Sequence, residues 1–371
     1  MSGTLAAALG GAAGAVALVG ITIIIIRYCL FRNRSISRTS ETNSSDPSLQ
    51  GDRRVSYAPE FQGARCFTLE ELNVATKNFS NINLIGYGMF GEVSKGLLHD
   101  GMVVAIKRRS CPPSQEFIEE VRYVSSIRHR NLVSLLGYCQ EDHIQMLIYE
   151  YIPNGSVSTH LYGAIQASSV KLEFKHRLSI AHGAAKGMVH LHSLNPPLVH
   201  MNFRTRNVLV DGDLTPKVAD AGICSLLDRI DSAASSSRLT EDDPFLDPDV
   251  KESGTLSIKS DVYSFGVFLL ELVTGREARS DRSVIQQNYN EAVDLSTLVD
   301  NRMGNSFTSE GIRVLLQLIS WCLNSSSEER PPMKFVELEL HRIHEREMSL
   351  TTIMGEGTTT VTLGSQLFTT S

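Results

Sequence analysis

A glycine-rich stretch followed by a lysine is the first set of residues that could do chemistry. Gly86, Gly88 and Gly91 are spaced as G-x-G-x-x-G, and Lys107 ends the apolar run 103–107. Because glycine has no side chain, a loop with this spacing lets the backbone approach phosphate oxygens closely. A lysine at the inner end of an apolar strand needs an anionic partner, since burying its charge alone is costly. The spacing therefore predicts a phosphate-binding loop with a lysine beside it.

The residues around this loop predict a hairpin and a helix. Segments 92–98 and 103–107 are typical of two strands, so the glycines do not open a helix as in a dinucleotide-binding fold. Apolar residues at helical spacing predict a helix over 115–128, and this helix carries Glu120. We expect Glu120 to form an ion pair with Lys107; the alternative is that Glu120 is merely solvated.

These motifs and several later ones resemble those of a protein kinase. The resemblance implies an α+β, two-lobed fold, with a β-rich small lobe at 66–151 and a helical large lobe at 152–346. The sequence is most similar to plant receptor-like kinases. The other segments that carry the resemblance are Val104-Ala105-Ile106-Lys107, Asp220-Ala221-Gly222, 260–267, 329–333 and, for the plant group, 67–80, 129–133 and 147–156.

The resemblance implies a cleft that binds ATP and Mg²⁺. In such a cleft Lys107 pairs with the α- and β-phosphates, while Asn207 and Asp220 ligate the metal. Tyr149 takes the gatekeeper position, and the backbone of 150–151 holds adenine. The nucleotide-binding residues that the resemblance implies are Gly86, Gly88, Gly91, Val93, Ala105, Lys107, Glu120, Tyr149 and Tyr151.

The catalytic loop departs from the family pattern where chemistry depends on it. The usual H-R-D-L-x-x-x-N reads His-Met-Asn-Phe-Arg-Thr-Arg-Asn over 200–207, so Asn202 stands where the catalytic aspartate belongs. A neutral amide cannot take up the proton of a substrate hydroxyl at neutral pH, and general-base help is worth typically ~10²–10⁴-fold. Met201 replaces the arginine that pairs with a phosphorylated activation segment. Arg204 takes the usual lysine position and keeps a positive charge near the transferring phosphate.

The activation segment diverges as well. Asp249 takes the position of the glutamate in the family's L-D-P-E, and the resemblance implies that it pairs with Arg330. Glu241 and Asp242 are acidic where relatives have a G-T-x-G-Y stretch, whose threonine braces the catalytic aspartate. Ala221 replaces the phenylalanine of D-F-G and so shrinks the side chain beneath the regulatory helix. Loss of the base and of its brace together favours a genuine loss of catalysis.

Three functions are compatible with these residues. The preferred interpretation is a membrane-anchored pseudokinase that binds ATP, transfers phosphate weakly or not at all, and signals by changing shape or docking a partner. An active serine/threonine protein kinase is the alternative, because Lys107, Glu120, Asn207 and Asp220 are all present. A nucleotide-free scaffold for an active partner kinase is the third. The expected partner is another receptor-like kinase or a signalling protein.

An uncharged apolar run at 5–26 predicts a transmembrane helix, because at ~1.5 Å per residue it spans a bilayer core. Several arginines follow it at once, and the positive-inside rule places this side in the cytoplasm. We therefore expect a single-pass protein with residues 1–4 outside and no ectodomain, in the plasma membrane by the resemblance. Small residues recur every four positions in the run and would allow a homodimer, although Ala and Gly are also simply common in such spans.

Composition limits the partners and the cysteine chemistry that the chain can have, and it characterises the two segments that flank the kinase-like region. The chain has 371 residues and a formal net charge of −6, which argues against a nucleic-acid partner. Its six cysteines lie far apart, so neither a disulfide framework nor a zinc site is expected. Segment 27–65 is basic and rich in serine, and we interpret it as a juxtamembrane linker. Segment 347–371 is rich in Thr and Ser and predicts a disordered tail.

Overall fold

The structure, a computed structural model, describes residues 63–162, 172–230, 243–278, 298–304 and 307–355. The predicted membrane span at 5–26 and nearly all of the linker lie outside these residues. Among the helices of the described ranges, none combines the length and the apolar character that crossing a bilayer requires.

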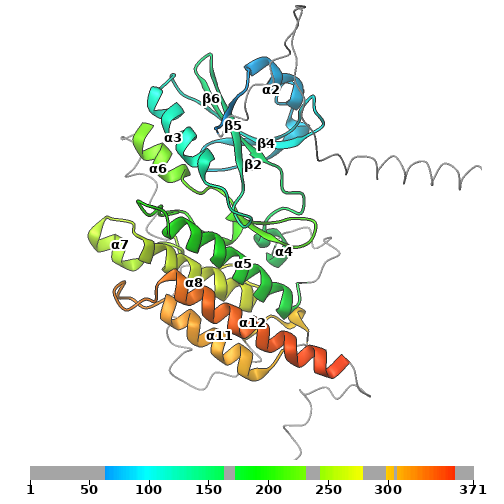
Figure 1. The fold of residues 1–371 in the computed structure, drawn as a ribbon, viewed down its shortest axis with the longest axis vertical. Helices are drawn as coiled ribbons and strands as arrows, with labels where there is room; N and C mark the ends of the chain where they lie inside the picture. The colour runs from blue at the N-terminus through cyan, green and yellow to red at the C-terminus, as the bar shows by residue number, and fades with distance from the viewer. Residues whose placement is uncertain (1–62, 163–171, 231–242, 279–297, 305–306, 356–371) are drawn as a thin grey trace, which may run out of the picture. The chain divides into compact units, whose positions relative to one another are not determined.

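The small lobe is a six-stranded sheet in the order β1-β5-β6-β4-β3-β2 (Figure 1). All neighbours are antiparallel except β1, which runs parallel to β5. The glycine-rich loop connects β2 to β3, and the expected strands and turn that follow it are confirmed. The strands are β1 (Arg65–Cys66), β2 (Leu84–Tyr87), β3 (Glu92–Leu97), β4 (Val103–Ser110), β5 (Leu135–Glu141) and β6 (Ile144–Glu150).

Two helices cover opposite faces of this sheet. Successive side chains of the central strands point to alternate faces, and apolar side chains on both faces pack against a helix. Along β6, Met146 and Ile148 pack under α2 (Leu69–Thr76), whereas Leu147 and Tyr149 pack under α3 (Gln115–Ser126). A capping box begins α2, and Ser114 caps α3. The helix expected over 115–128 is thus confirmed. The same alternation in β4 turns Lys107 away from the α2 side and into a cleft below the sheet.

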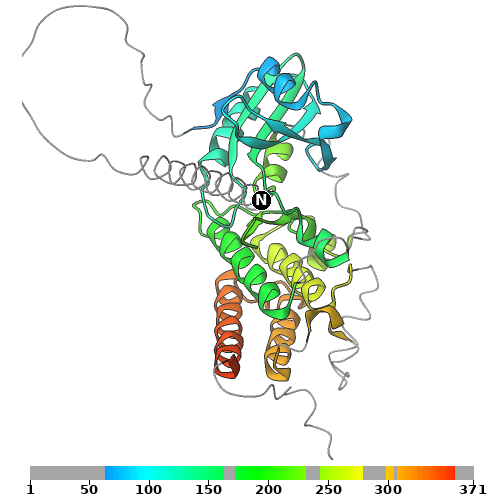
Figure 2. The ribbon, with the colours of Figure 1, turned by 90° about the vertical axis from the view of Figure 1, so that its right-hand side faces the viewer.

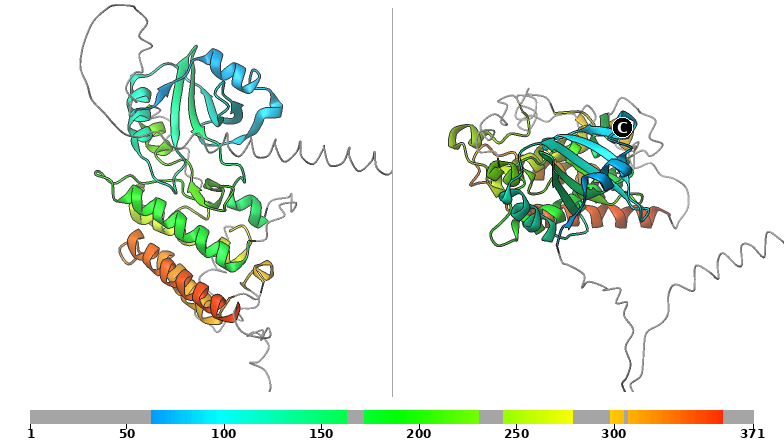
Figure 3. Two further views of the ribbon diagram at one scale, coloured as in Figure 1. Left: turned by 45° about the vertical axis from the view of Figure 1, so that its right-hand side comes forward. Right: turned by 90° about the horizontal axis from the view of Figure 1, so that it is seen from above.

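The large lobe is built from helices around the buried helix α8 (Ile258–Thr274) (Figures 1 and 2). The long helices α5 (Phe174–His192) and α12 (Met333–Gly355) run side by side, as Figure 3 shows. The other elements of the lobe are α4 (Val157–Tyr162), η2 (Thr205–Asn207), β7 (Val208–Val210), β8 (Pro216–Val218), α6 (Ile223–Ile230), α7 (Pro248–Ser253), η4 (Asn301–Met303) and α11 (Ser309–Cys322). The expected two-lobed protein kinase fold is confirmed.

Two expectations about the large lobe need correction. Helix α12 continues to Gly355, so residues 347–355 are helical although they were assigned to the tail. Glu347 fixes this extension, because its carboxylate accepts the backbone N–H of Thr308 at 3.0 Å. Arg330 pairs chiefly with Asp247, at 2.6 and 2.7 Å to its two oxygens, and Asp249 lies 3.9 Å away. The expected partner Asp249 is therefore only secondary, because Asp247 is the buried carboxylate that a buried guanidinium requires.

Candidate functional site

A cleft of about 440 Å³ lies between the two lobes. The sheet provides its roof and the strand β7 its floor, where Val93, Ala105 and Leu209 form an apolar slot. The chain between β6 and α4 lines its back. Most of the predicted nucleotide and metal residues meet here: Gly86, Gly88, Val93, Ala105, Lys107, Tyr149, Tyr151, Asn202, Asn207 and Asp220 all line the cleft.

Lys107 finds its anionic partner at the start of the activation segment. Its ammonium forms a largely buried ion pair with Asp220, so a residue of the small lobe is tied to one of the large lobe. The same ammonium lies 5.5 Å above the ring of Tyr149. Asp220 adopts a left-handed backbone conformation with φ 67°. The lysine expected to contact phosphate is therefore in the cleft, paired with the carboxylate expected to ligate metal.

Glu120 does not reach Lys107, and the expected ion pair between them is wrong for this conformation. Glu120 instead lies 3.1 Å from Arg229 of α6, the helix that follows Asp220-Ala221-Gly222. The carboxylate is buried, and burial raises its pKa although Arg229 opposes the shift. Helix α6 lies alongside α3, as Figure 1 shows, and this arrangement brings Arg229 within reach of Glu120.

Helix α6 is held there by an apolar face. Ile223, Leu226 and Leu227 join the cluster that includes Phe117 and Val121 of α3. These positions follow the i, i+3, i+4 spacing of an amphipathic helix. Sequence reasoning missed α6, although this spacing was a signal that could have found it.

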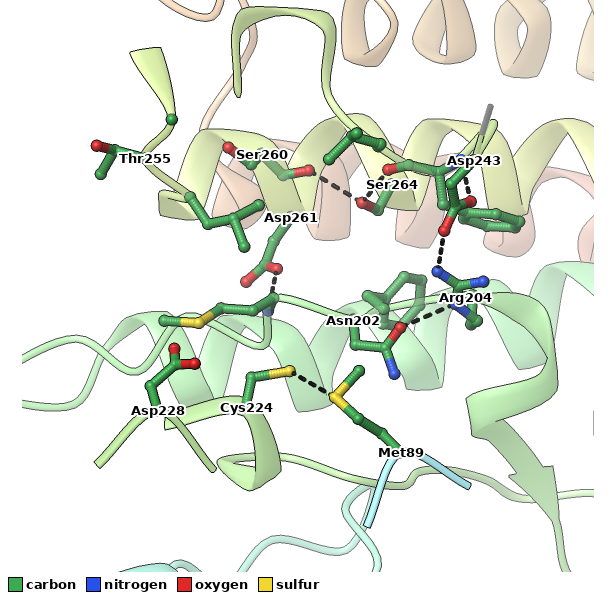
Figure 4. A pocket seen from close by; sticks show the side chains of 16 residues that line it. Met89, Asn202, Arg204, Cys224, Asp228, Asp243, Thr255, Ser260, Asp261 and Ser264 are labelled. Carbon is green, nitrogen blue, oxygen red and sulfur yellow. Dashed lines mark hydrogen bonds and ion pairs between the residues drawn. The ribbon is translucent and has the colours of Figure 1, made fainter. Parts of the chain in front are cut away.

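The glycine-rich loop is folded against the same cluster. Phe90 at its tip is buried and stacks on Phe117, with ring centroids 6.4 Å apart. Gly91 has φ 141°, and a Cβ atom there would overlap the carbonyl of Arg108. Gly91 thus shapes the loop without lining the cleft. Met89 reaches across to the activation segment, where its sulfur lies 3.5 Å from that of Cys224 (Figure 4).

Asn202 is held by a chain of polar contacts that ends on an acidic residue. Arg204 donates from Nε to Oδ1 of Asn202 at 3.0 Å, and its terminal nitrogen pairs with Asp243. The amide nitrogen of Asn202 faces the other way, toward Met89 (Figure 4). Arg204 therefore lies beside the cleft rather than in it. Glu241 and Asp242 lie outside the described residues. Their neighbour Asp243 is described, and its carboxylate pairs with Arg204.

The catalytic loop around Asn202 is ordered by a buried aspartate. Asp261 accepts the backbone N–H groups of His200 and Met201 at 2.8 and 3.0 Å, and it also bonds His192 at 2.8 Å. His200 bonds the carbonyl of Ala219 at 2.9 Å, next to Asp220. His192 and His200 thus order this part of the large lobe. Buried hydrogen bonds therefore hold the backbone on both sides of Asn202.

Tyr149, which we expect at the gatekeeper position, carries a hydroxyl that is buried without a hydrogen-bond partner among the described residues. Burial raises its pKa, and the negative charge of Asp220 adds to the shift. The hydroxyl is consequently neutral and can donate a hydrogen bond. Tyr149 thus adds a polar group to the cleft beside the apolar slot of Val93, Ala105 and Leu209.

Comparison with known proteins agrees with this fold and site. The family of protein tyrosine and serine/threonine kinases matches residues 79–340. Together with the two lobes and the cleft, this match defines the class: the chain belongs to the protein kinase family. Its relatives are plant receptor-like kinases, and it is of that type.

Three relatives illustrate the similarity. The chain is 37 % identical to the probable serine/threonine-protein kinase PBL28 of Arabidopsis thaliana over 341 residues, covering 87 % of this chain and 88 % of that protein. It is 35 % identical over 351 residues to the wall-associated receptor kinase-like 20 of the same plant, covering 90 % of this chain and 53 % of the relative. A probable leucine-rich repeat receptor-like protein kinase from Arabidopsis, 35 % identical, is covered over 34 % of its length, against 85 % of this chain. The chain thus spans about a third to a half of these two receptor-like relatives.

A solved structure shows the same fold. The pseudokinase domain of BIR2, described as an immune regulator of the RLK/Pelle family, superposes with a TM-score of 0.64 at 28 % sequence identity. The match covers 75 % of this chain and 86 % of that domain.

Proposed function

We propose that this chain is a pseudokinase of the plant receptor-like type, in which phosphotransfer is weak or absent. One observation carries the proposal. At the position of the catalytic base the side chain is an amide whose oxygen is held by Arg204 and whose nitrogen faces away from it (Figure 4). An amide nitrogen donates hydrogen bonds and has no lone pair available for a substrate proton. The group presented there therefore cannot act as a general base.

ATP with Mg²⁺ is the ligand that the cleft fits best. Its volume of about 440 Å³ falls in the range usual for small-molecule sites. Its residues offer an apolar slot for a base, and Lys107 for phosphate oxygens. The carboxylate of Asp220 and the side-chain oxygen of Asn207 would hold the metal, because hard cations prefer oxygen ligands. Bound Mg-ATP would supply negative charge that competes with Asp220 for Lys107.

The placement of α6 supports signalling by a change of shape. Glu120 is paired with Arg229 of α6, and Lys107 is paired with Asp220 in the cleft. A ligand that separates Lys107 from Asp220 frees the lysine for Glu120, and α3 and α6 must then move apart. A partner protein that binds only one position of α3 would then bind or dissociate without any phosphotransfer. The expected partner is a receptor-like kinase or another signalling protein.

Anchoring in a membrane belongs to the same proposal. It rests on the uncharged run at 5–26 and on the arginines that follow it, which favour a single-pass protein with the kinase domain in the cytoplasm. The plasma membrane is proposed from the receptor-like relatives. A homodimer through the small residues of this span is a further element of the proposal.

The decisive experiment restores the missing carboxylate. Purified wild-type chain, Asn202→Asp and Lys107→Met are compared for autophosphorylation with ATP and Mg²⁺, and again with Mn²⁺. We expect activity only in Asn202→Asp, with a gain on the order of 10²-fold or more, because Lys107, Asn207 and Asp220 already line the cleft. Robust activity of the wild type that is lost in Lys107→Met would contradict the proposal and identify a working serine/threonine kinase.

Nucleotide binding is tested separately by thermal unfolding with ATP and Mg²⁺. A ligand that binds only the folded state raises the melting temperature by mass action. We expect an increase in the wild type that is absent in Lys107→Met. No increase at millimolar ATP would leave a nucleotide-free scaffold as the function.

A further inference from the structure

A row of histidines surrounds Lys186 on the outer side of the large lobe. His182, Lys186 and His190 are four residues apart along α5, so they lie on one face over roughly 12 Å. His190 stacks on His129, with ring centroids 4.9 Å apart. At the other end, His182 stacks on a histidine of α12. The imidazole row, as we name it, consists of His129, His190, Lys186, His182, His341 and His344.

The row joins three separate parts of the chain. His341 and His344 come from α12, with ring centroids 5.0 and 6.2 Å from that of His182. His129 comes from the segment between α3 and β5. Figure 3 shows α5 and α12 running side by side, which brings these rings together.

Positive charge outweighs negative charge around the row. Two carboxylates face it: Glu337 lies between His182 and Lys334, at 3.1 and 2.8 Å, and Glu345 lies 3.9 Å from His344. The permanent cations near the row are Arg130, Lys186, Lys217 and Lys334, of which Lys217 is paired with Glu150 and Lys334 with Glu337. In the described part of the chain no ion pair is recorded for Lys186. Both Lys186 and His341 are exposed.

Three imidazoles of the row, those of His129, His182 and His344, resist protonation in the free protein. Burial is the main cause that lowers the pKa values of His129, His182 and His344, and the neighbouring cations lower them further. Nδ1 of His129 accepts the backbone N–H of Asn131 at 3.2 Å, a bond that favours the neutral ring. A negatively charged ligand would remove this resistance, because opposite charge favours the protonated form.

We propose that the imidazole row is a docking surface for a carboxylate-rich segment of a partner protein, and that it binds this segment more tightly as the pH falls. The surface is linear and its exposed groups are basic. A membrane surface is a poorer fit, because interfacial binding relies on apolar side chains beside the cations. A metal is a poorer fit as well, since the described residues contain no cluster of His, Cys, Asp and Glu arranged to hold one. This surface is independent of nucleotide binding.

Linkage makes the proposal quantitative. If the anionic segment raises the affinity of the row for protons, protons must raise the affinity for the segment by the same factor. For each proton taken up on binding, the dissociation constant falls about tenfold when the pH is lowered by one unit. We expect at least one proton to be taken up below about pH 6.5, the ordinary pKa of histidine.

The experiment uses the purified full chain and a short poly-aspartate peptide, which stays ionised above about pH 5 because Asp titrates near 3.9. Isothermal titration calorimetry is run at about pH 5.5 and about pH 7.5, in two buffers with different ionisation enthalpies to count the protons. The exposed residues Lys186 and His341 are changed to glutamine one at a time. His99→Gln, in the exposed turn between β3 and β4, is the matched control.

The proposal predicts tighter binding at the lower pH, proton uptake on binding, weaker binding of Lys186→Gln at both pH values, and weaker binding of His341→Gln than of the wild type. Circular dichroism at both pH values checks that each variant is folded. Binding that does not change with pH, or that His99→Gln weakens as much as the row variants do, would overturn it. Stronger binding to vesicles containing phosphatidylserine than to the peptide would also overturn it, in favour of a lipid surface.

Discussion

At the scale of single residues, the cleft combines the residues that we propose to bind nucleotide and metal with an amide at the position proposed for the base. Lys107, Asn207 and Asp220 all line it, whereas the position of the base is occupied by an amide that is already engaged by Arg204. A carboxylate and an amide have nearly the same shape, so this exchange alters proton affinity and charge with little change of packing. A binding site can therefore persist when catalysis does not.

The hydroxyl of Tyr149 gives a prediction at this scale. A buried hydroxyl without a partner costs about 1–3 kcal/mol, so Tyr149→Phe should leave the free energy of unfolding unchanged or raise it by about 1 kcal/mol. Tyr162→Phe is the matched control, because its hydroxyl donates to Glu271 at 3.0 Å and its loss should destabilise by about 1 kcal/mol. Urea unfolding followed by circular dichroism measures both. Equal destabilisation by the two changes would show that the Tyr149 hydroxyl has a partner.

At the scale of elements, the glycine-rich loop depends on one backbone conformation. Gly91→Ala places a Cβ atom against the carbonyl of Arg108 and forces an unfavourable φ, which should cost about 1–3 kcal/mol or rebuild the loop. Gly86→Ala is the control, since nothing lies within 4 Å of a Cβ atom there. Melting temperatures of the two variants measure the difference. A Gly91→Ala protein as stable as Gly86→Ala would contradict the conformation described for the loop.

The hairpin around the glycine-rich loop and the helix over 115–126 could be predicted from the sequence because both depend on local periodicity. The partner of Glu120 could not, because it depends on where α6 packs, and that is decided by contacts with residues about a hundred positions away. The same holds for Arg204, whose contact with Asp243 joins two loops. The acidic character of the activation segment was visible, but not which acidic residue reaches the catalytic loop.

At the scale of the whole molecule, the buried histidines predict a pH limit on stability. The folded-state pKa values of His129, His182 and His344 lie below the ordinary value, so the unfolded chain binds protons more readily. Their stabilising contribution is therefore complete above about pH 6.5 and is lost as the pH falls through 6.5 toward the folded-state values.

The measurement is the melting temperature as a function of pH for wild type and His344→Gln, with His99→Gln as control. We expect the wild type to lose more stability than His344→Gln between about pH 7 and about pH 5.5, a range that spans the ordinary histidine pKa. Comparing variants cancels the contribution of other groups, including Glu120, whose raised pKa acts in the opposite direction. Parallel curves for all three proteins would rule out this role of the row.

The short strand β1 decides how a mechanical pull on the chain before it would reach the folded unit. Only Arg65 and Cys66 pair with β5, in parallel, and they approach so closely that a Cβ atom at Gly137 would overlap the carbonyl of Arg65. Tension along the preceding chain therefore loads two rungs of one sheet edge before it loads any strand around the cleft. Under such a pull this edge pairing would open first, would release a few residues, and would leave the cleft and α3 unloaded.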